Sequence, residues 1–351
     1  MAFCRYTCVA SALIGIAMSA ALAQGTPVAN PDPSLLPYMN LSDTVTLADG
    51  RRIHFTCMGT GSPTVILTAG MGDWGVTWNQ VQPQIARQTR VCAWDRAGFG
   101  FSDSSRAEQT ITATTDDLGA ALDRGHFRPP FVLVGHSLGG LETLVLADRR
   151  PHQIAGIVLV DPSVPDQAAE MRASAPAMAA ALGPLLSTNV ALLRHCSEEI
   201  RNGTIAIGTP DPDGCLQYPS TYPAALSAVL ARLDSDPTRL ATEASLLANF
   251  ERDATIAINP RRRYGSVPII ILSATDVQPP PPGLSAEAVA QMPAFQRRFI
   301  AAHDRLAALS TRGTNRLVTG TSHYIQRIKP DAVIQAVEEV VNQARTGPRR
   351  R

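Results

Sequence analysis

The segment Phe131–Ala147, "FVLVGHSLGGLETLVLA", constrains the fold more than any other part of the chain. An apolar run typical of a buried strand leads directly into GHSLG, whose serine is Ser137, and a helix-like apolar run follows. The pattern Gly-x-Ser-x-Gly between a strand and a helix predicts a sharp turn with a strained serine, and the glycines leave room for close backbone approach. The Ser137 hydroxyl is then held above the sheet edge at a helix N-terminus, where a nucleophile would stand.

Strand-like and helix-like runs alternate on both sides of this motif. Buried-strand patterns occur at 64–70, 91–95, 131–135 and 156–161, and the same rhythm resumes after 263. Such alternation predicts βαβ units, so we expect an α/β fold with a mostly parallel, eight-stranded sheet flanked by helices. The core of this fold would then comprise residues 44–161 and 264–345, with a solvated tail at 346–351.

Residues 162–263 break this rhythm. They contain alanine- and leucine-rich helical pieces interrupted by Gly and Pro, with no clear strand. An insertion between two sheet strands is suited to cover a site at the strand carboxyl ends. We therefore expect a helical cap at 162–263 that selects the substrate.

The N-terminus has the pattern of a secretory signal peptide at residues 1–23. It contains Arg5, an apolar run at 9–21 and the sequence Ala-Leu-Ala before Gln24. The run is short for a bilayer span, and no other segment appears long and apolar enough, so we expect an exported protein without a membrane span, periplasmic or secreted. Residues 24–43 are proline-rich and predict an extended arm.

Four cysteines remain after the expected cleavage: Cys57, Cys92, Cys196 and Cys215. An even number in an exported chain favours disulfides, although four buried free thiols are the alternative. Cys196 and Cys215 bracket a loop rich in Gly, Pro and Asp, where a crosslink would reduce the entropy of the unfolded chain. Cys57 and Cys92 lie on two strand-like runs and can pair only if those strands are neighbours. No Cys/His cluster has zinc spacing, so we expect no metal.

A serine nucleophile needs a base and an acid that orients the base. His323 follows the strand-like run "NRLVTG" and is the best-placed of seven histidines, whereas His136 beside Ser137 should point away. The acid should follow a strand between serine and histidine in the chain. Asp276 after "PIIILSAT" is preferred, and Asp161 at the end of "GIVLVD" is the alternative.

The oxyanion donors should be two backbone amides near the serine. Leu138 N–H follows the nucleophile, and Met71 N–H lies in the glycine-rich turn "LTAGMGDWG" after an earlier strand. Each donor contributes about 3 kcal/mol to transition-state stabilisation. Trp74 in this turn is the candidate residue of the substrate pocket, and Trp78 reads equally well as a core aromatic.

Taken together, "TAGMGDWG", "VCAWDRAGFGFSD", "VLVGHSLGG", "LVLVDPS" and "GTSHYIQ" resemble the α/β-hydrolase fold superfamily, in its branch with a helical cap. The resemblance spans residues 44–341 and implies a triad of Ser137, His323 and Asp276 that works without a cofactor. It also implies that the strands bearing Cys57 and Cys92 are adjacent. Two motifs depart from the family pattern: many members have His-Gly where this chain has Ala-Gly at 69–70, and Ser-Ala-Thr-Asp at 273–276 replaces Gly-x-x-Asp.

These features predict a serine hydrolase that cleaves carboxylic esters, lactones or related acyl compounds. An aminopeptidase, a cofactor-free haloperoxidase or a non-catalytic binder of the same fold are the alternatives. An aminopeptidase would use acidic cap residues such as Glu170, Glu198 and Glu199 to bind an amine. Lys+Arg 31 against Asp+Glu 30 gives a net charge of +1 without a basic stripe, which argues against a nucleic-acid partner.

Overall fold

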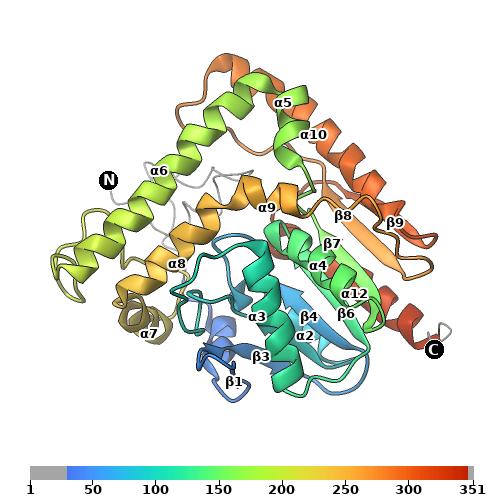
Figure 1. The fold of residues 1–351 in the computed structure, drawn as a ribbon, viewed down its shortest axis with the longest axis horizontal. Coiled ribbons are helices and arrows are strands. Elements are labelled where there is room, and N and C mark those ends of the chain that lie inside the picture. Colours follow the sequence, from blue (N-terminus) through green and yellow to red (C-terminus); the bar gives the residue numbers. More distant parts are fainter. Residues whose placement is uncertain (1–29, 347–351) are drawn as a thin grey trace.

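A computed structural model of the chain describes residues 30–346 (Figure 1). Its main sheet has the strand order β3-β5-β4-β6-β7-β8-β9, in which β3 is antiparallel to β5 and every other pair is parallel. The α/β architecture is therefore confirmed, while the signal peptide expected at 1–23 lies outside the described residues. The seven strands are β3 (Phe55–Met58), β4 (Thr64–Thr68), β5 (Val91–Trp94), β6 (Phe131–His136), β7 (Ile154–Val160), β8 (Ile269–Ala274) and β9 (Gly313–Val318).

The expected count of eight strands is wrong within the described part of the chain. β1 (Val45–Thr46) and β2 (Arg52–Ile53) pair only with each other, in a separate two-stranded sheet. The turn between them is closed by Asp49, whose carboxylate accepts the Arg51 amide N–H, and by Gly50 at φ 87°. Each strand has only two residues, and the hairpin does not extend the main sheet, although its Val45 and Ile53 are buried in the core.

The arm expected at residues 24–43 is not extended over its described part. Pro33–Met39 form a 3-10 helix, η2, which begins after Asp32, and the Asp32 side chain accepts the Ser34 N–H. Leu35 and Tyr38 of η2 are buried against the core. Burial of these two apolar side chains explains why the proline-rich segment folds back onto the domain.

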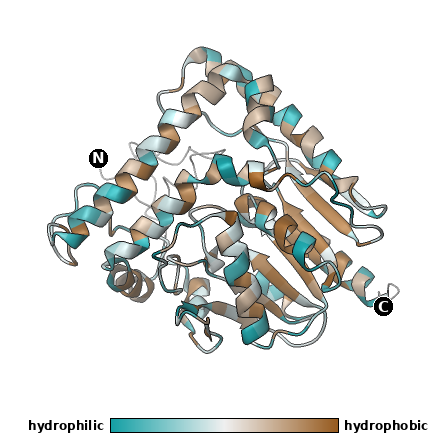
Figure 2. Cartoon of the chain, viewed as in Figure 1, coloured by the Kyte–Doolittle hydropathy of each residue, from teal (hydrophilic) through white to brown (hydrophobic). Residues whose placement is uncertain are grey.

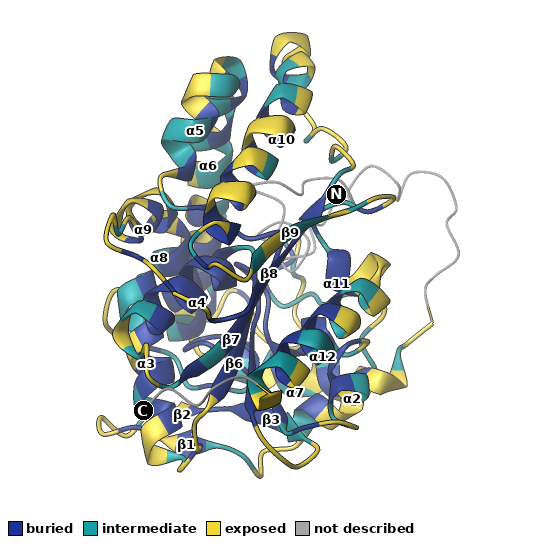
Figure 3. Cartoon of the chain, turned by 90° about the vertical axis from the view of Figure 1, so that its right-hand side faces the viewer, coloured by how far each residue is buried: buried dark blue, intermediate teal, exposed yellow. Residues whose placement is uncertain are grey.

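Helices cover both faces of the sheet, and its inner strands are apolar and buried, whereas the edge strand β9 is partly exposed (Figures 2 and 3). Alternate residues of β6 point to opposite faces: Val132 and Val134 pack with α12, and Phe131 and Leu133 belong to the opposite cluster. Helix α12 packs on the sheet through an apolar stripe, because it buries Val333, Val337, Val340 and Val341. The core helices are α2 (Gln82–Ile85), α3 (Ile111–Arg124), α4 (Leu138–Arg149), α10 (Ala286–Ala307), α11 (Ile325–Ile328) and α12 (Pro330–Thr346), and the short 3-10 helix η3 spans Gly75–Trp78.

Five helices lie between β7 and β8, and we call residues 162–268 the helical insertion. In Figure 1 its helices α6 and α8 cross the molecule side by side, and contacts between them agree. The expected change from strands to helices over 162–263 thus matches the observed secondary structure. The insertion comprises α5 (Gln167–Ser174), α6 (Pro176–Arg201), α7 (Ala224–Asp234), α8 (Pro237–Ala248) and α9 (Phe250–Ile256).

The expectation that no segment after the signal-like residues is long and apolar enough for a membrane span is wrong by these two criteria. Helix α6 has 26 residues and an 18-residue window of mean hydropathy 1.4, so by length and composition it meets the requirement for a span. It packs against α5, α8 and α10, and it buries Leu182, Val190 and Leu193. Only 22% of that window is buried in the structure, so these contacts cover a minor part of the apolar helix.

A buried arginine holds the insertion on the core. The Arg239 guanidinium on α8 is paired with Asp234 at 2.9 Å and donates to the carbonyls of Gly100 and Ser102 at 2.7 and 2.6 Å. All of these contacts are removed from solvent, and the Thr242 hydroxyl adds a bond to the Ser105 carbonyl. Helix α8 is consequently fixed on the glycine-rich turn that follows β5.

The four cysteines form two disulfides, Cys57–Cys92 and Cys196–Cys215. Cys57 on β3 lies directly opposite Cys92 on β5, so the two strands are neighbours as the family resemblance implied. The second disulfide links the end of α6 to the following loop. Disulfides of this kind fit an oxidising environment.

Candidate active site

Ser137 lies at the sharp turn that its motif predicts. β6 ends at His136, α4 begins at Leu138, and Ser137 between them has φ 52° and ψ −122°. A Cβ atom built on Gly135 would lie 2.3 Å from the Gly139 carbonyl oxygen, so no larger residue fits there without a shift. The glycines therefore permit the turn, and the strained backbone holds the serine at the carboxyl end of β6.

His323 is oriented by Asp161. The His323 Nδ1 atom lies 2.7 Å from Asp161 Oδ2, and both side chains are buried, at 4% and 1% exposure. The other carboxylate oxygen accepts the Ala274 N–H at 3.0 Å, so both oxygens are held. A carboxylate only accepts hydrogen bonds, so Nδ1 carries the proton and Nε2 keeps a lone pair that can accept one.

The preferred acid, Asp276, is not placed against His323. Its side chain is exposed in the loop after β8, where Oδ1 accepts the Gly320 N–H at 3.2 Å and the Thr275 hydroxyl at 3.0 Å. Asp161 directly follows β7, the strand next to β6, and its positive φ of 40° turns the chain sharply before a proline. We therefore replace Asp276 by Asp161, the alternative, as the acid of the candidate triad.

His136 does not simply point away from the site, as the sequence suggested. Its Nε2–H donates to the backbone carbonyl of His323 at 3.0 Å, and the two rings are 4.6 Å apart. Complete burial is the main cause that lowers the pKa of His136 well below its usual value, and the charge of the nearby His323 lowers it further. The His136 ring is therefore neutral. His136 thus anchors the loop that bears the candidate base, a contact across 187 residues that no local motif signals.

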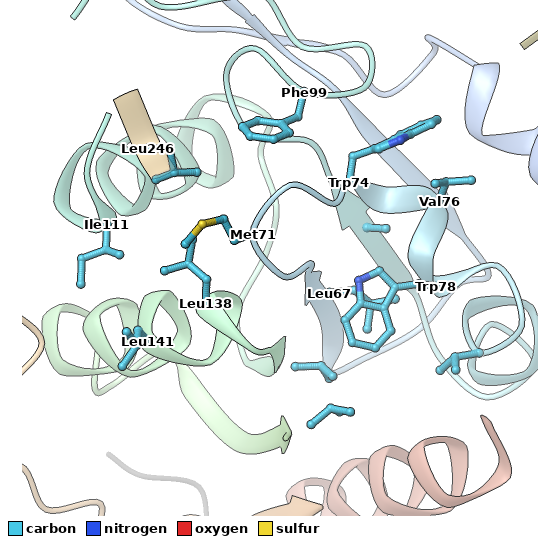
Figure 4. Packing of buried hydrophobic residues seen from close by; sticks show 14 of the residues in the cluster. Leu67, Met71, Trp74, Val76, Trp78, Phe99, Ile111, Leu138, Leu141 and Leu246 are labelled. Atoms are coloured by element: carbon cyan, nitrogen blue, oxygen red, sulfur yellow. The ribbon is translucent and has the colours of Figure 1, made fainter. Parts of the chain in front are cut away.

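The expected oxyanion loop lies against the nucleophile. A Cβ atom built on Gly70 would be 3.3 Å from the Ser137 Cβ, and Figure 4 shows Met71 beside Leu138. Among the residues that the structure describes, the amide N–H groups of Met71 and Leu138 have no hydrogen-bond acceptor. Two backbone donors therefore remain available next to Ser137.

Trp74 lies where the core meets the helical insertion. It is buried, and its Nε1–H donates to the hydroxyl of Tyr222 in the insertion at 3.2 Å. Its ring also makes edge contacts with Tyr38 and Phe101 (Figure 4 shows the ring). Trp78 is fully buried in the same cluster and is a core residue.

An ion pair connects the oxyanion loop to the histidine loop. Arg327 Nη2 lies 3.1 and 2.9 Å from the two carboxylate oxygens of Asp73, and its Nε donates to the Thr77 hydroxyl at 3.2 Å. The guanidinium also lies over the Tyr324 ring at 4.6 Å. The two loops that would bind the oxyanion and supply the base are thereby held at a fixed separation.

Within residues 30–346, no group of three or more His, Cys, Asp or Glu side chains is arranged to hold a metal ion.

Comparison with known proteins identifies the fold. Residues 63–195 match the family model described as alpha/beta hydrolase fold. The esterase from Thermogutta terrifontis has a TM-score of 0.55 at 20% identity, covering 86% of this chain and 98% of that one. Epoxide hydrolase CorEH has a TM-score of 0.54 at 16% identity, covering 85% and 96%. The chain has the α/β-hydrolase fold.

Curated relatives match over shorter stretches. The uncharacterized protein YqjL of Bacillus subtilis (strain 168) is 33% identical over 108 residues, 31% of this chain and 43% of that protein. Lipase LipV of Mycobacterium tuberculosis (strain ATCC 25618 / H37Rv) is 34% identical over 129 residues, 36% of this chain and 48% of LipV. A putative non-heme haloperoxidase of Mycobacterium phage D29 is 32% identical over 120 residues, 34% of this chain and 42% of that protein. The chain thus aligns with less than half of each of these relatives.

Proposed function

We propose that this protein is a serine hydrolase that cleaves small carboxylic esters, lactones or related acyl compounds through an acyl-enzyme. The observation that carries the proposal is the 2.7 Å contact between His323 Nδ1 and Asp161. The strained Ser137 lies on the neighbouring strand end, where its N–H donates to the carbonyl of Val160, the residue before Asp161. A nucleophile, a correctly protonated base and an orienting acid are the three groups that acyl transfer requires.

In the first half-reaction, Ser137 Oγ attacks the acyl carbonyl carbon while His323 Nε2 takes the hydroxyl proton. The oxyanion that forms is bound by Met71 N–H and Leu138 N–H, each contributing about 3 kcal/mol. When the tetrahedral intermediate collapses, its bond to the alcohol oxygen breaks, and His323 gives its proton to that oxygen. Asp161 stabilises the transient imidazolium throughout.

In the second half-reaction, His323 removes a proton from water, and the resulting nucleophile attacks the acyl carbon. The bond to Ser137 Oγ breaks, the serine recovers its proton from His323, and the carboxylic acid leaves. This sequence uses the chain's own groups alone and restores them at the end of each turnover.

The alternatives are less well supported. Epoxide hydrolases occur among the structural neighbours, but opening an epoxide in this fold would require a carboxylate where this chain has Ser137. Glu170 accepts from both Arg298 and Arg305, so it is engaged by cations of the chain and is a poor site for a substrate amine. An aminopeptidase role therefore has no support from this residue, whereas the esterase and lipase relatives favour esters.

We also propose that the protein is exported to the periplasm or the medium, and that the helical insertion is a cap that limits which acyl groups reach Ser137. The signal-like residues 1–23 and the two disulfides support export. Arg239 supports the cap role, because it fixes α8 against the turn beside Trp74.

A fluorophosphonate probe tests the function directly. Wild-type protein should be labelled once and should hydrolyse p-nitrophenyl esters, whereas Ser137→Ala should lose both properties while keeping its fold. Ser174→Ala, which changes a serine on α5, is the matched control and should behave as wild type. A folded wild type that takes up no probe would identify a non-catalytic binder, and a graded ester panel would define the acyl size that the cap admits.

A further inference from the structure

We propose that Arg96 is a positioning residue for the oxyanion site, an inference that rests on the proposed function. Arg96 follows β5, and its side chain is almost fully buried, at 2% exposure. Its Nη1 donates to the Gly70 carbonyl at 2.9 Å, and its Nη2 donates to the Ala69 carbonyl. One guanidinium thus holds two successive carbonyls of the loop that carries Met71.

Because of the geometry of the peptide group, the hydrogen bonds from Arg96 also orient the Met71 N–H, the oxyanion donor. The Gly70 carbonyl and the Met71 N–H belong to the same planar peptide, and in a trans peptide they point in opposite directions. Fixing the Gly70 oxygen towards Arg96 therefore fixes the Met71 N–H on the side of the loop away from Arg96. The loop itself abuts Ser137, because a Cβ on Gly70 would lie 3.3 Å from the serine Cβ.

Glu142 supplies the counter-charge for the buried Arg96 guanidinium. Its carboxylate accepts from Arg96 Nε at 2.8 Å and from Nη2, and it is 1% exposed. A buried arginine without a counter-charge would be strongly unfavourable. Glu142 lies on α4, the helix that begins directly after Ser137, so the ion pair also ties the nucleophile's helix to the oxyanion loop.

The positive charge of Arg96 also affects how strongly the Met71 N–H donates. A hydrogen bond from a cation to a carbonyl polarises the peptide, and hydrogen bonds in a chain strengthen one another at low dielectric. Met71 N–H is therefore both aimed and made a stronger donor. Arg96 provides this support at a position where the chain has Ala69, a residue without a polar side chain.

The test compares two variants. The first combines Arg96→Met with Glu142→Leu, which removes both charges and leaves apolar side chains. The second is Arg262→Met. Arg262 is the matched control, because it is also a buried arginine that bonds a carboxylate, Asp148, and a carbonyl, Ala257, away from the oxyanion loop. Three quantities are measured: kcat/KM for a p-nitrophenyl ester, the affinity of a trifluoromethyl ketone that forms a tetrahedral adduct, and the affinity of the matching secondary alcohol.

The double variant should lose about 10²-fold in kcat/KM and in ketone affinity, the range for losing one oxyanion donor, with alcohol affinity unchanged. Arg262→Met should lower the melting temperature and leave all three quantities at wild-type values. If the double variant does not fold, Arg96→Lys is used, because an ammonium has three donors and cannot replace the four hydrogen bonds that the guanidinium makes to Glu142 and the two carbonyls. This variant should lose at least tenfold in ketone affinity.

A folded variant with kcat/KM within threefold of wild type would overturn the inference and leave the proposed function standing. Equal losses of ketone and alcohol affinity would also overturn it, since they would indicate a general disturbance of the pocket. A wild-type protein that neither takes up the fluorophosphonate nor hydrolyses any ester would refute the proposed function, and the role of Arg96 with it.

Discussion

Replacing Asp161 by Asn should abolish most activity, and the structure gives the reason. In the wild type, Asp161 Oδ1 accepts the Ala274 N–H, and Oδ2 faces His323 Nδ1 at 2.7 Å. In Asp161→Asn, the Ala274 N–H still requires an acceptor, so the amide oxygen stays there and the amide NH₂ faces His323. Two donors cannot share that contact, so Nδ1 must lose its proton and Nε2 must gain it.

A His323 protonated at Nε2 cannot accept the Ser137 proton. The corresponding acid-to-amide change in a Ser-His-Asp protease lowers kcat about 10⁴-fold, equivalent to about 5.4 kcal/mol of activation free energy. We expect a loss of that order here, measured as kcat for a p-nitrophenyl ester between pH 6 and 9, with the folded state checked by circular dichroism. Asp276→Asn is the paired control and should remain within twofold of wild type, because Asp276 is exposed and bonds Gly320 and Thr275. If Asp276→Asn lost activity and Asp161→Asn kept it, the reasoning would be refuted.

Two further predictions concern stability. Burial raises the pKa of Asp253 to about 7, above the value near 3.9 of an unfolded aspartate. The folded state therefore binds this proton more tightly than the unfolded state, and the free energy of unfolding should fall as pH rises from about 4 to 7. Asp253→Asn, which keeps an acceptor for the Ile111 N–H, should flatten this decline in urea unfolding, and an equal wild-type-to-variant difference at pH 4 and pH 8 would contradict it. Arg239→Met should destabilise the protein by about 3–5 kcal/mol, because it removes the cation beside the buried Asp234 carboxylate and the donor to the Gly100 carbonyl. An unchanged denaturation midpoint would show that α8 is held on the core by other contacts.

The parts of the fold that follow from short-range patterns could be predicted from the sequence. The strand–turn–helix around Ser137 and the βαβ rhythm depend on local apolar periodicity and on glycine spacing, which the sequence displays directly. The position of His323 after the last strand also follows from chain order. Conversely, β1 and β2 have only two residues each, and nothing local indicates that they pair apart from the main sheet.

The choice of acid could not be made in the same way. Asp161 and Asp276 both follow strands, and both satisfy the chain order of the triad, so only the three-dimensional turn after β7 distinguishes them. The contacts of His136 with the His323 carbonyl and of Arg96 with Glu142 join residues 187 and 46 positions apart. Such long-range pairs leave no periodic trace in one sequence, although a buried arginine in a glycine-rich turn signals that a carboxylate and carbonyls lie nearby.

The most direct measurement is a crystal structure of the fluorophosphonate adduct. We expect phosphorus bonded to Ser137 Oγ, the phosphonyl oxygen about 3 Å from the Met71 and Leu138 amide nitrogens, and His323 within hydrogen-bond reach of the adduct while still bound to Asp161. Phosphorus on another residue, or a phosphonyl oxygen pointing away from both amides, would contradict the mechanism.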